Sequence, residues 1–408
     1  MAETDGVDGW RVLDGGLSAW FDAPSLRVGA ALAGRVVELV GERELPDFDL
    51  RDSGVRVRIG VPGSEPGQAD VVLAGGISAA ALELGMVADP AGLQVMRVAV
   101  WSGELPPVVS FWSSAFGYGS VGDERFGDPL RRDPAISFHR LEEPRPLRNR
   151  IHVDVSRPSD AVEAFRAAVG QEAFGPWGVA LADPDGNEID LVPGGELTDE
   201  TKGTDEAATA DWRVLFGAMT FYPTTSSAVA GRLAAAVAGL ADEAGRSLLV
   251  DLRPDGVTID SGKDQWENDV AGFVRLAARI QSAARELGLS AEPARLRFVQ
   301  FGIDAVDVAA VKDFWTTVLG YREDPRGWDL YDPRRLNPTF IFQQMDAGES
   351  ERRSQRNRTQ LELLVPADLL ESRLDTAVAA GGKILPAERP GTRAVADPEG
   401  NELIFLTS

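Results

Sequence analysis

The chain contains no cysteine among its 408 residues. Disulfide bonds, thiolate nucleophiles and cysteine-ligated zinc or iron–sulfur centres are therefore excluded. Histidine is almost as scarce, because His139 and His152 are the only two in the sequence. Imidazole is the side chain best suited to proton transfer near neutral pH and is a common metal ligand. Any site that needs one must therefore include His139 or His152.

Basic residues are also in short supply. Lysine and arginine number 41 against 64 acidic residues, which gives a net charge of −23 and a pI near 4.6. Such a charge argues against nucleic acid and anionic membrane surfaces as partners, because both would repel the protein. The sequence also lacks an apolar run long enough to span a membrane and an N-terminal targeting signal. We expect a cytoplasmic protein.

The most informative feature of the chain is an internal repeat. Four landmarks occur twice and in the same order, which indicates two copies of one composite unit. We call these copies the A half and the B half. The paired landmarks are Trp10–Leu13 with Trp212–Leu215, Phe111–Trp112 with Phe314–Trp315, Arg148–Arg150 with Arg356–Arg358, and Asp183–Glu188 with Asp397–Glu402.

Each half divides into two segments with different patterns. The first segments, 8–88 and 211–290, read as strand, helix, strands and helix, with an apolar helical stripe over 25–41 that ends at Gly41. The second segments, 93–194 and 295–408, read twice as strand, helix and further strands. Between the halves, residues 195–210 are rich in Gly, Thr and acidic residues. This composition predicts a solvated, mobile acidic linker.

The second segments resemble the vicinal-oxygen-chelate superfamily, which includes glyoxalases, bleomycin-resistance proteins and extradiol dioxygenases. The resemblance rests on the Phe-Trp…Gly-Tyr helix end, the strand after Arg-Asn-Arg, and the Asp-Pro-(Asp/Glu)-Gly-Asn-Glu turn into the last strand. It implies that each second segment is a pair of βαβββ modules around a cavity. It further implies a glyoxalase- or bleomycin-resistance-like protein that binds a small molecule in the cavity of the A half.

The first segments more faintly resemble pterin-4a-carbinolamine dehydratase. The similarity lies in an early Trp, a long amphipathic helix, a turn at Glu44-Leu45-Pro46 and a Val-x-Val-x-Ile strand. The histidines on which that family depends are missing, because Glu44-Leu45 stands in their place in A and 247–249 in B. Residual dehydratase activity or pterin binding would have to use carboxylates. The resemblance predicts an α+β chain built as a tandem duplication, with an intramolecular pseudo-dimer or a homodimer formed through these segments.

Metal-binding members of the vicinal-oxygen-chelate superfamily take ligands from the first and last strands of each module. Carried over to this sequence, the resemblance implies one set of positions in each half. Arg97 cannot ligate, because a guanidinium has no free lone pair, which leaves His139, His152 and Asp190 as a possible Fe, Mn or Zn site. The B set is metal-free. The positions are Arg97, His139, His152 and Asp190 in A, and Gln300, Gln343, Gln360 and Ile404 in B.

Strand alternation predicts which side chains face the A cavity. If Ile151, Val153 and Val155 pack on helices, His152 and Asp154 face inward. The same reasoning directs Asp190 inward from the last strand. Trp101 alternates with helix-facing valines on its strand, so that it lines the cavity together with Arg97.

These observations leave three hypotheses open. The first is a metal-free small-molecule-binding protein of the drug-resistance type, which Arg97 and the three glutamines of the B half favour. The second is a metal-dependent lyase or dioxygenase that uses His139, His152 and Asp190. The third is a scaffold built from two decayed enzyme folds, in which His152 makes only a structural hydrogen bond.

Overall fold

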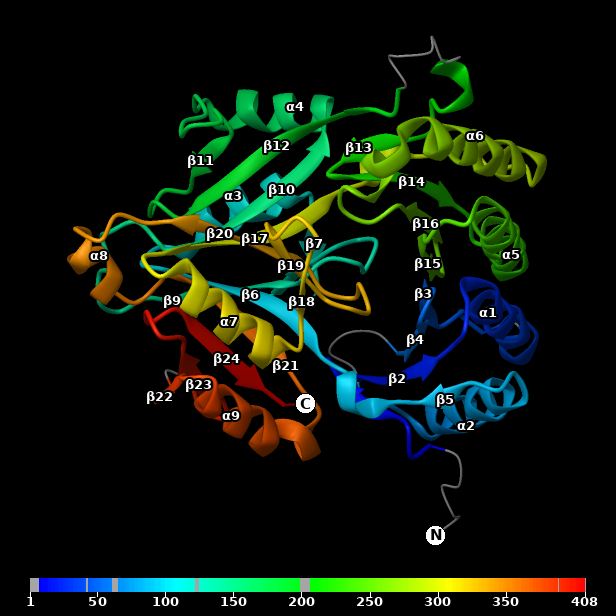
Figure 1. Cartoon of the computed structure of the whole chain (residues 1–408), viewed down its shortest axis with the longest axis horizontal. Helices are drawn as coiled ribbons and strands as arrows, with labels where there is room; N and C mark the ends of the chain where they lie inside the picture. Colours follow the sequence, from blue (N-terminus) through cyan, green and yellow to red (C-terminus); the bar gives the residue numbers. More distant parts are fainter. Residues whose placement is uncertain are drawn as a thin grey trace. The chain divides into compact units, whose positions relative to one another are not determined.

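The computed structural model describes residues 7–41, 43–60, 65–121, 125–198, 206–387 and 389–407. The chain is α+β and forms two compact units. The first unit contains the described residues up to 93, together with 157–159 and 193–298. The second unit contains 94–156, 160–192 and the described residues from 299 onward. Each unit therefore combines one segment from the A half with its copy from the B half (Figure 1).

In the first unit, the two copies have the same succession of elements up to their second helix, after which the A copy adds the short strand β5. The helix predicted over 25–41 is observed, because Ser25 accepts a hydrogen bond from the backbone N–H of Val28 and Gly41 ends the helix with a φ of 57°. The A copy consists of β1 (Arg11–Leu13), β2 (Gly16–Asp22), α1 (Leu26–Val40), β3 (Asp47–Arg51), β4 (Gly54–Ile59), α2 (Gln68–Glu83) and β5 (Val87–Ala88). The B copy consists of β13 (Arg213–Leu215), β14 (Gly217–Pro223), α5 (Ser227–Ala244), β15 (Leu249–Arg253), β16 (Gly256–Asp260) and α6 (Val270–Glu286).

The two copies share one sheet and one hydrophobic core. The strand order is β1-β2-β4-β3-β15-β16-β14-β13, and β3 meets β15 in antiparallel register with Leu50 opposite Val250. Helices α1 and α5 lie side by side (Figure 1), and their side chains Val36 and Val237 are fully buried in the same core. The copies therefore associate within one chain, through strands as well as through helices.

Buried charges cross the junction between β3 and β15. Arg51 of one copy donates to Asp251 of the other at 2.7 Å, and Arg253 donates in return to Asp49 at 2.6 Å. All four side chains are almost completely buried. Burial alone would raise the pKa of Asp49, but Arg253 and Arg56 hold it well below its usual value. The carboxylate is thus kept ionised by its arginine partners.

The second unit contains four modules of strand, helix and strands. In the A half these are β6 (Val95–Ser102), α3 (Leu105–Phe116), β7 (Gly119–Ser120), β8 (Arg125–Gly127) and β9 (Ile136–Arg140), then β10 (Ile151–Pro158), α4 (Ser159–Val169), β11 (Ala180–Ala182) and β12 (Glu188–Glu196). In the B half they are β17 (Phe298–Ala305), α7 (Val308–Leu319), β18 (Arg322–Glu323), β19 (Asp329–Tyr331) and β20 (Thr339–Gln344), then, after α8 (Ser350–Ser354), β21 (Thr359–Leu364), α9 (Leu370–Ala379), β22 (Lys383–Leu385), β23 (Arg393–Ala396) and β24 (Glu402–Leu406).

These modules pair across the two halves rather than within each half. An eight-stranded sheet has the order β22-β23-β24-β21-β6-β9-β8-β7, so the first module of A joins the second module of B. The other sheet of this unit has the order β12-β10-β17-β20-β19-β18, with β11 on β12, and joins the second module of A to the first of B. We call it the His152 sheet. The sequence had led us to expect that each half would pair its own two modules.

The repeated Arg-Asn-Arg motif links the two halves where the modules are exchanged. The Oδ1 atom of Asn149 accepts a hydrogen bond from the backbone N–H of Arg358 at 2.7 Å, and Oδ1 of Asn357 accepts one from Arg150 at 2.8 Å. Both asparagines are buried. Because a buried amide without partners is costly, these reciprocal bonds hold the start of β10 against the start of β21.

The segment predicted as a linker is only partly described. Gly195 and Glu196 still belong to β12 and pair with β13, and Leu197 is buried. Residues 199–205 lie outside the described part of the chain. Within the described residues, no helix combines the length and apolar character that a membrane crossing requires.

Candidate metal centre

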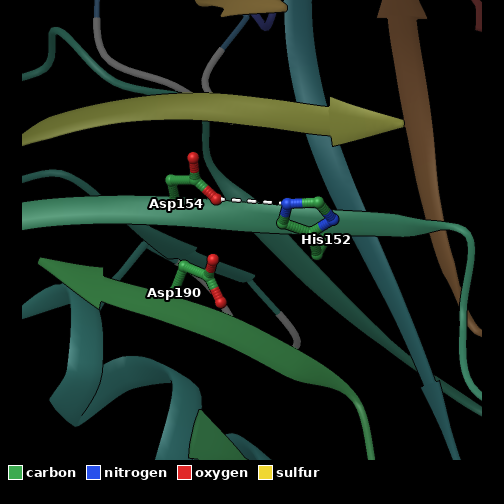
Figure 2. A group of neighbouring side chains, drawn as sticks. All are labelled: His152, Asp154 and Asp190. Carbon is green, nitrogen blue, oxygen red and sulfur yellow. Dashed lines mark ion pairs between the residues drawn. The ribbon is translucent and has the colours of Figure 1, made fainter. Parts of the chain in front are cut away.

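Two adjacent strands of the His152 sheet carry the candidate centre. His152 and Asp154 alternate along β10 with the buried apolar residues Ile151 and Val153, as strand periodicity predicted. Asp190 lies on β12, between the buried residues Ile189 and Leu191. Since β10 and β12 are neighbours in the sheet, the three polar side chains meet on one face. Figure 2 shows them pointing toward one another.

The spacing of these side chains suits a metal ion. One ligating atom from each of His152, Asp154 and Asp190 lies within 4.8 Å of the others. Nε2 of His152 is 3.4 Å from Oδ1 of Asp154 (Figure 2). Two ligands of a tetrahedral ion with bonds of about 2.1 Å are about 3.4 Å apart. His152 and Asp154 are each 5% exposed and Asp190 is half-buried, so that bulk water screens the site only in part.

The electrostatics of the centre favour a cation. Burial and the neighbouring carboxylate of Asp154 raise the pKa of Asp190 to about 6, although His152 and Arg148 act in the opposite direction. Two carboxylates in a poorly solvated place repel each other, and a divalent ion between them would remove that repulsion. The residues present therefore fit a divalent metal in charge as well as in spacing.

Neighbouring residues hold the candidate ligands in position. Nε2 of Gln300, on β17, donates to Oδ2 of Asp154 at 2.6 Å. The imidazole of His152 lies directly over Gly302, where an added Cβ would be 2.1 Å from Nε2. Nε2 of His152 is itself buried and makes no hydrogen bond within the described residues. An oriented imidazole with an unused ring nitrogen is what a metal ligand requires.

His139 does not join this group. It lies on β9 in the eight-stranded sheet, where its Nε2 is 3.1 Å from Nη1 of Arg389 and 3.0 Å from Oγ of Ser137. Arginine can only donate, so the Nε2 lone pair is already used. The structure therefore does not bring together His139, His152 and Asp190. Asp154 completes the group in place of His139. Strand alternation had predicted that Asp154 faces inward, but the sequence had not indicated it as a ligand.

The other predicted cavity residues divide between the two sheets. Gln300 supports the centre through Asp154, and Gln343 lies on β20 opposite Asp304 of β17. Gln360 lies in the eight-stranded sheet and accepts a hydrogen bond from Trp101 Nε1 at 2.9 Å. Arg97 lies in the same sheet, opposite Glu362. The sequence showed the periodicity of each strand but not which strands become neighbours.

Comparison with known families agrees with this architecture. The model of the glyoxalase-like domain matches residues 97–192 and 300–406. Together these segments cover just under half of the chain and lie in the second unit. The protein thus contains two glyoxalase-like domains, as the resemblance of the second segments predicted. The match does not extend to the first segments. No curated protein sequence matches the chain.

Several solved structures match the chain at low sequence identity and low TM-score. A mutant of glyoxalase I from Zea mays is 12% identical, with 78% of this chain and 95% of that chain covered and a TM-score of 0.35. A putative dioxygenase from Bacillus subtilis is 10% identical, with 76% and 84% covered and a TM-score of 0.38. The cppA protein from Streptococcus pneumoniae is 8% identical, with 77% and 97% covered and a TM-score of 0.33. Identities this low carry no information on activity.

Proposed function

We propose that the protein binds one divalent transition-metal ion at His152, Asp154 and Asp190 and, through it, a small molecule with two adjacent oxygen atoms. The observation that carries the proposal is the convergence of these three ligating groups on one face of the His152 sheet. The two glyoxalase-like domains support the same kind of ligand. In this proposal Asp154 replaces His139 in the ligand set suggested by the sequence.

One imidazole and two carboxylates suit Fe(II), Mn(II) or Zn(II) and leave positions open for substrate oxygens. When bound, such an ion would polarise a carbonyl or hydroxyl of the ligand. The chain's own residues prepare the site: Gln300 fixes the orientation of Asp154, and Gly302 leaves room for the imidazole of His152. A lyase or dioxygenase reaction is consistent with this set.

A metal-free binding protein of the bleomycin-resistance type is the second candidate. It is favoured by the raised pKa of Asp190, because a protonated carboxyl can donate a hydrogen bond to a polar ligand. Residual dehydratase activity or pterin binding in the first unit remains a prediction. It would depend on carboxylates, since both histidines lie in the second segments.

Calorimetric titration of the metal-stripped protein with Zn²⁺ and with Mn²⁺ separates the candidates. The variant His152→Gln copies the residue that the B half has at the corresponding position, Gln360. We expect one ion to bind per wild-type chain and the variant to lose about tenfold or more in affinity. The matched variant His139→Gln should bind as the wild type does. If neither ion binds to the wild type, the metal-free candidate replaces the proposal.

A further inference from the structure

The eight-stranded sheet contains the B copy of the candidate centre, but in altered form. Gln360 and Ile404 occupy the positions that correspond to His152 and Asp190, while Glu362 corresponds to Asp154. The guanidinium of Arg389 contacts both Glu362 and His139. An arginine thus already neutralises the remaining carboxylate, and an amide and an aliphatic side chain replace the other ligands. A divalent ion has no suitable ligand set there.

A cavity of about 420 Å³ adjoins this altered copy. Lys383, Ala396 and Glu402 line it, and the strand register places these residues in one row across β22, β23 and β24. Side chains in one such row share a face of the sheet. Glu402 accepts a hydrogen bond from Gln360, so the cavity lies on the face that carries the altered copy. Its volume is within the range of small-molecule sites.

The three carboxylates that line the cavity already have hydrogen-bond partners. Each accepts hydrogen bonds from side chains or from the backbone, which occupy its oxygens, and Glu402 also forms an ion pair with Arg356. The donors are Arg356 and Gln360 for Glu402, the backbone N–H groups of Val306 and Asp307 for Glu399, and Trp315 and Asn401 for Asp397.

Two cations that line the cavity are in the opposite situation. Arg353 and Lys383 are exposed, and their side chains make no hydrogen bond or ion pair with any residue in the described part of the chain. Arg150 lies close to the cavity, because it donates to the backbone oxygens of Glu399 and Gly400. Together with Arg356, these cations outnumber the three carboxylates by four to three, which gives a small local excess of positive charge, and hence a locally positive potential, in a chain of net charge −23. Such a potential attracts a ligand with negative charge.

We propose that this cavity is a second binding site, independent of metal, for a small organic dianion. Lys383 and Arg353 would each bind one anionic group, and the apolar side chain of Leu385 would contact the carbon skeleton between them. Carboxylate and phosphate groups share this recognition chemistry. The proposal does not depend on the metal centre, because that centre lies on the His152 sheet.

Calorimetry on the protein stripped of metal with EDTA tests the site, with succinate and inorganic phosphate as probes at low salt and succinamide as the uncharged control. We expect saturable binding of at least one anion, weaker binding as salt is added, and none of succinamide. The double variant Lys383→Met/Arg353→Met should lose about tenfold or more in affinity. Both side chains are exposed, so an unchanged melting temperature should show that the fold is retained. Succinate binding alone would indicate a dicarboxylate, and phosphate binding a phosphate ester.

Two matched variants place the site. Arg232→Met removes an exposed charge from α5 in the first unit and should leave anion binding unchanged. His152→Ala should also leave it unchanged, even where it abolishes metal binding. The proposal is overturned if neither anion saturates the wild type, if the double variant binds as well as the wild type, or if His152→Ala abolishes anion binding. That last result would move the anion to the metal centre.

Discussion

Replacing Asp190 with asparagine should stabilise the metal-free protein and, at the same time, abolish metal binding. The variant keeps the shape of the side chain but removes one of two carboxylates that repel each other in a poorly solvated place. Burial and Asp154 raise the pKa of Asp190 from 3.8 to about 6. Below about pH 4 the carboxyl is protonated in both the folded and the unfolded chain, and it contributes nothing to stability. Between pH 4 and 6 only the folded chain holds the proton.

The folded state therefore loses stability as the pH rises through this window, and the loss is complete above about pH 6. The shift corresponds to about 3 kcal/mol at 1.36 kcal/mol per pKa unit. Because the side chain is half-buried, screening by solvent reduces this to about 2 kcal/mol. The free energy of unfolding of Asp190→Asn should exceed that of the wild type by this amount at pH 7. For a unit of this size the gain is about 4–8 °C in melting temperature.

Urea unfolding of both proteins in EDTA, at several pH values from 3.5 to 8, measures the difference directly. The difference should be near zero at the acid end, should grow between pH 4 and 6, and should then stay constant. Zn²⁺ or Mn²⁺ should stabilise the wild type and not the variant, so that the order of stabilities reverses with metal. Asp160→Asn, an exposed residue of α4, serves as the control. The reasoning is refuted if Asp190→Asn is less stable than the wild type at pH 7 without metal, or if the difference does not depend on pH.

Three further substitutions test other parts of the structure. Gly302→Ala places a Cβ 2.1 Å from the imidazole of His152 and should weaken metal binding about tenfold or more. The control Gly34→Ala, in open space on α1, should leave the metal titration curve unchanged. Equal metal affinities in the two variants would contradict the assigned position of the imidazole. Arg253→Met removes one of the two arginines that donate to the buried carboxylate of Asp49, the other being Arg56, and should cost about 1.5–3 kcal/mol in urea unfolding. A loss below about 1 kcal/mol would show that the pair is dispensable. Asn149→Ala removes a buried acceptor and donor between the two halves and should cost about 1–3 kcal/mol in urea unfolding. An unchanged free energy of unfolding would show that these bonds do not hold the two halves together.

The local structure of the site could be predicted from the sequence. Alternation along residues 151–155 placed His152 and Asp154 on one face, and the same reasoning placed Asp190. The apolar stripe over 25–41 and the glycine at position 41 marked the extent of α1. These features depend on periodicity and on backbone conformation within a few residues, which a single sequence shows directly.

The neighbours of each strand could not be predicted in this way. His139 and His152 belong to the same half, yet they lie in different sheets, because β6 pairs with β21 and β10 lies next to β17. Duplication makes both pairings possible, since either second module offers the same strand edge to a first module. The choice depends on contacts such as that between Asn149 and Arg358, which are far apart in the sequence. The role of Arg389 beside His139 has the same origin.

The central claim is tested most directly by crystals grown with Zn²⁺ and by an anomalous difference map recorded at the zinc absorption edge. The account predicts one strong peak on the His152 sheet, at about 2.0–2.2 Å from His152 Nε2 and from one oxygen each of Asp154 and Asp190, and no peak beside His139. A map without a peak at His152, or with its only peak beside His139, would contradict it.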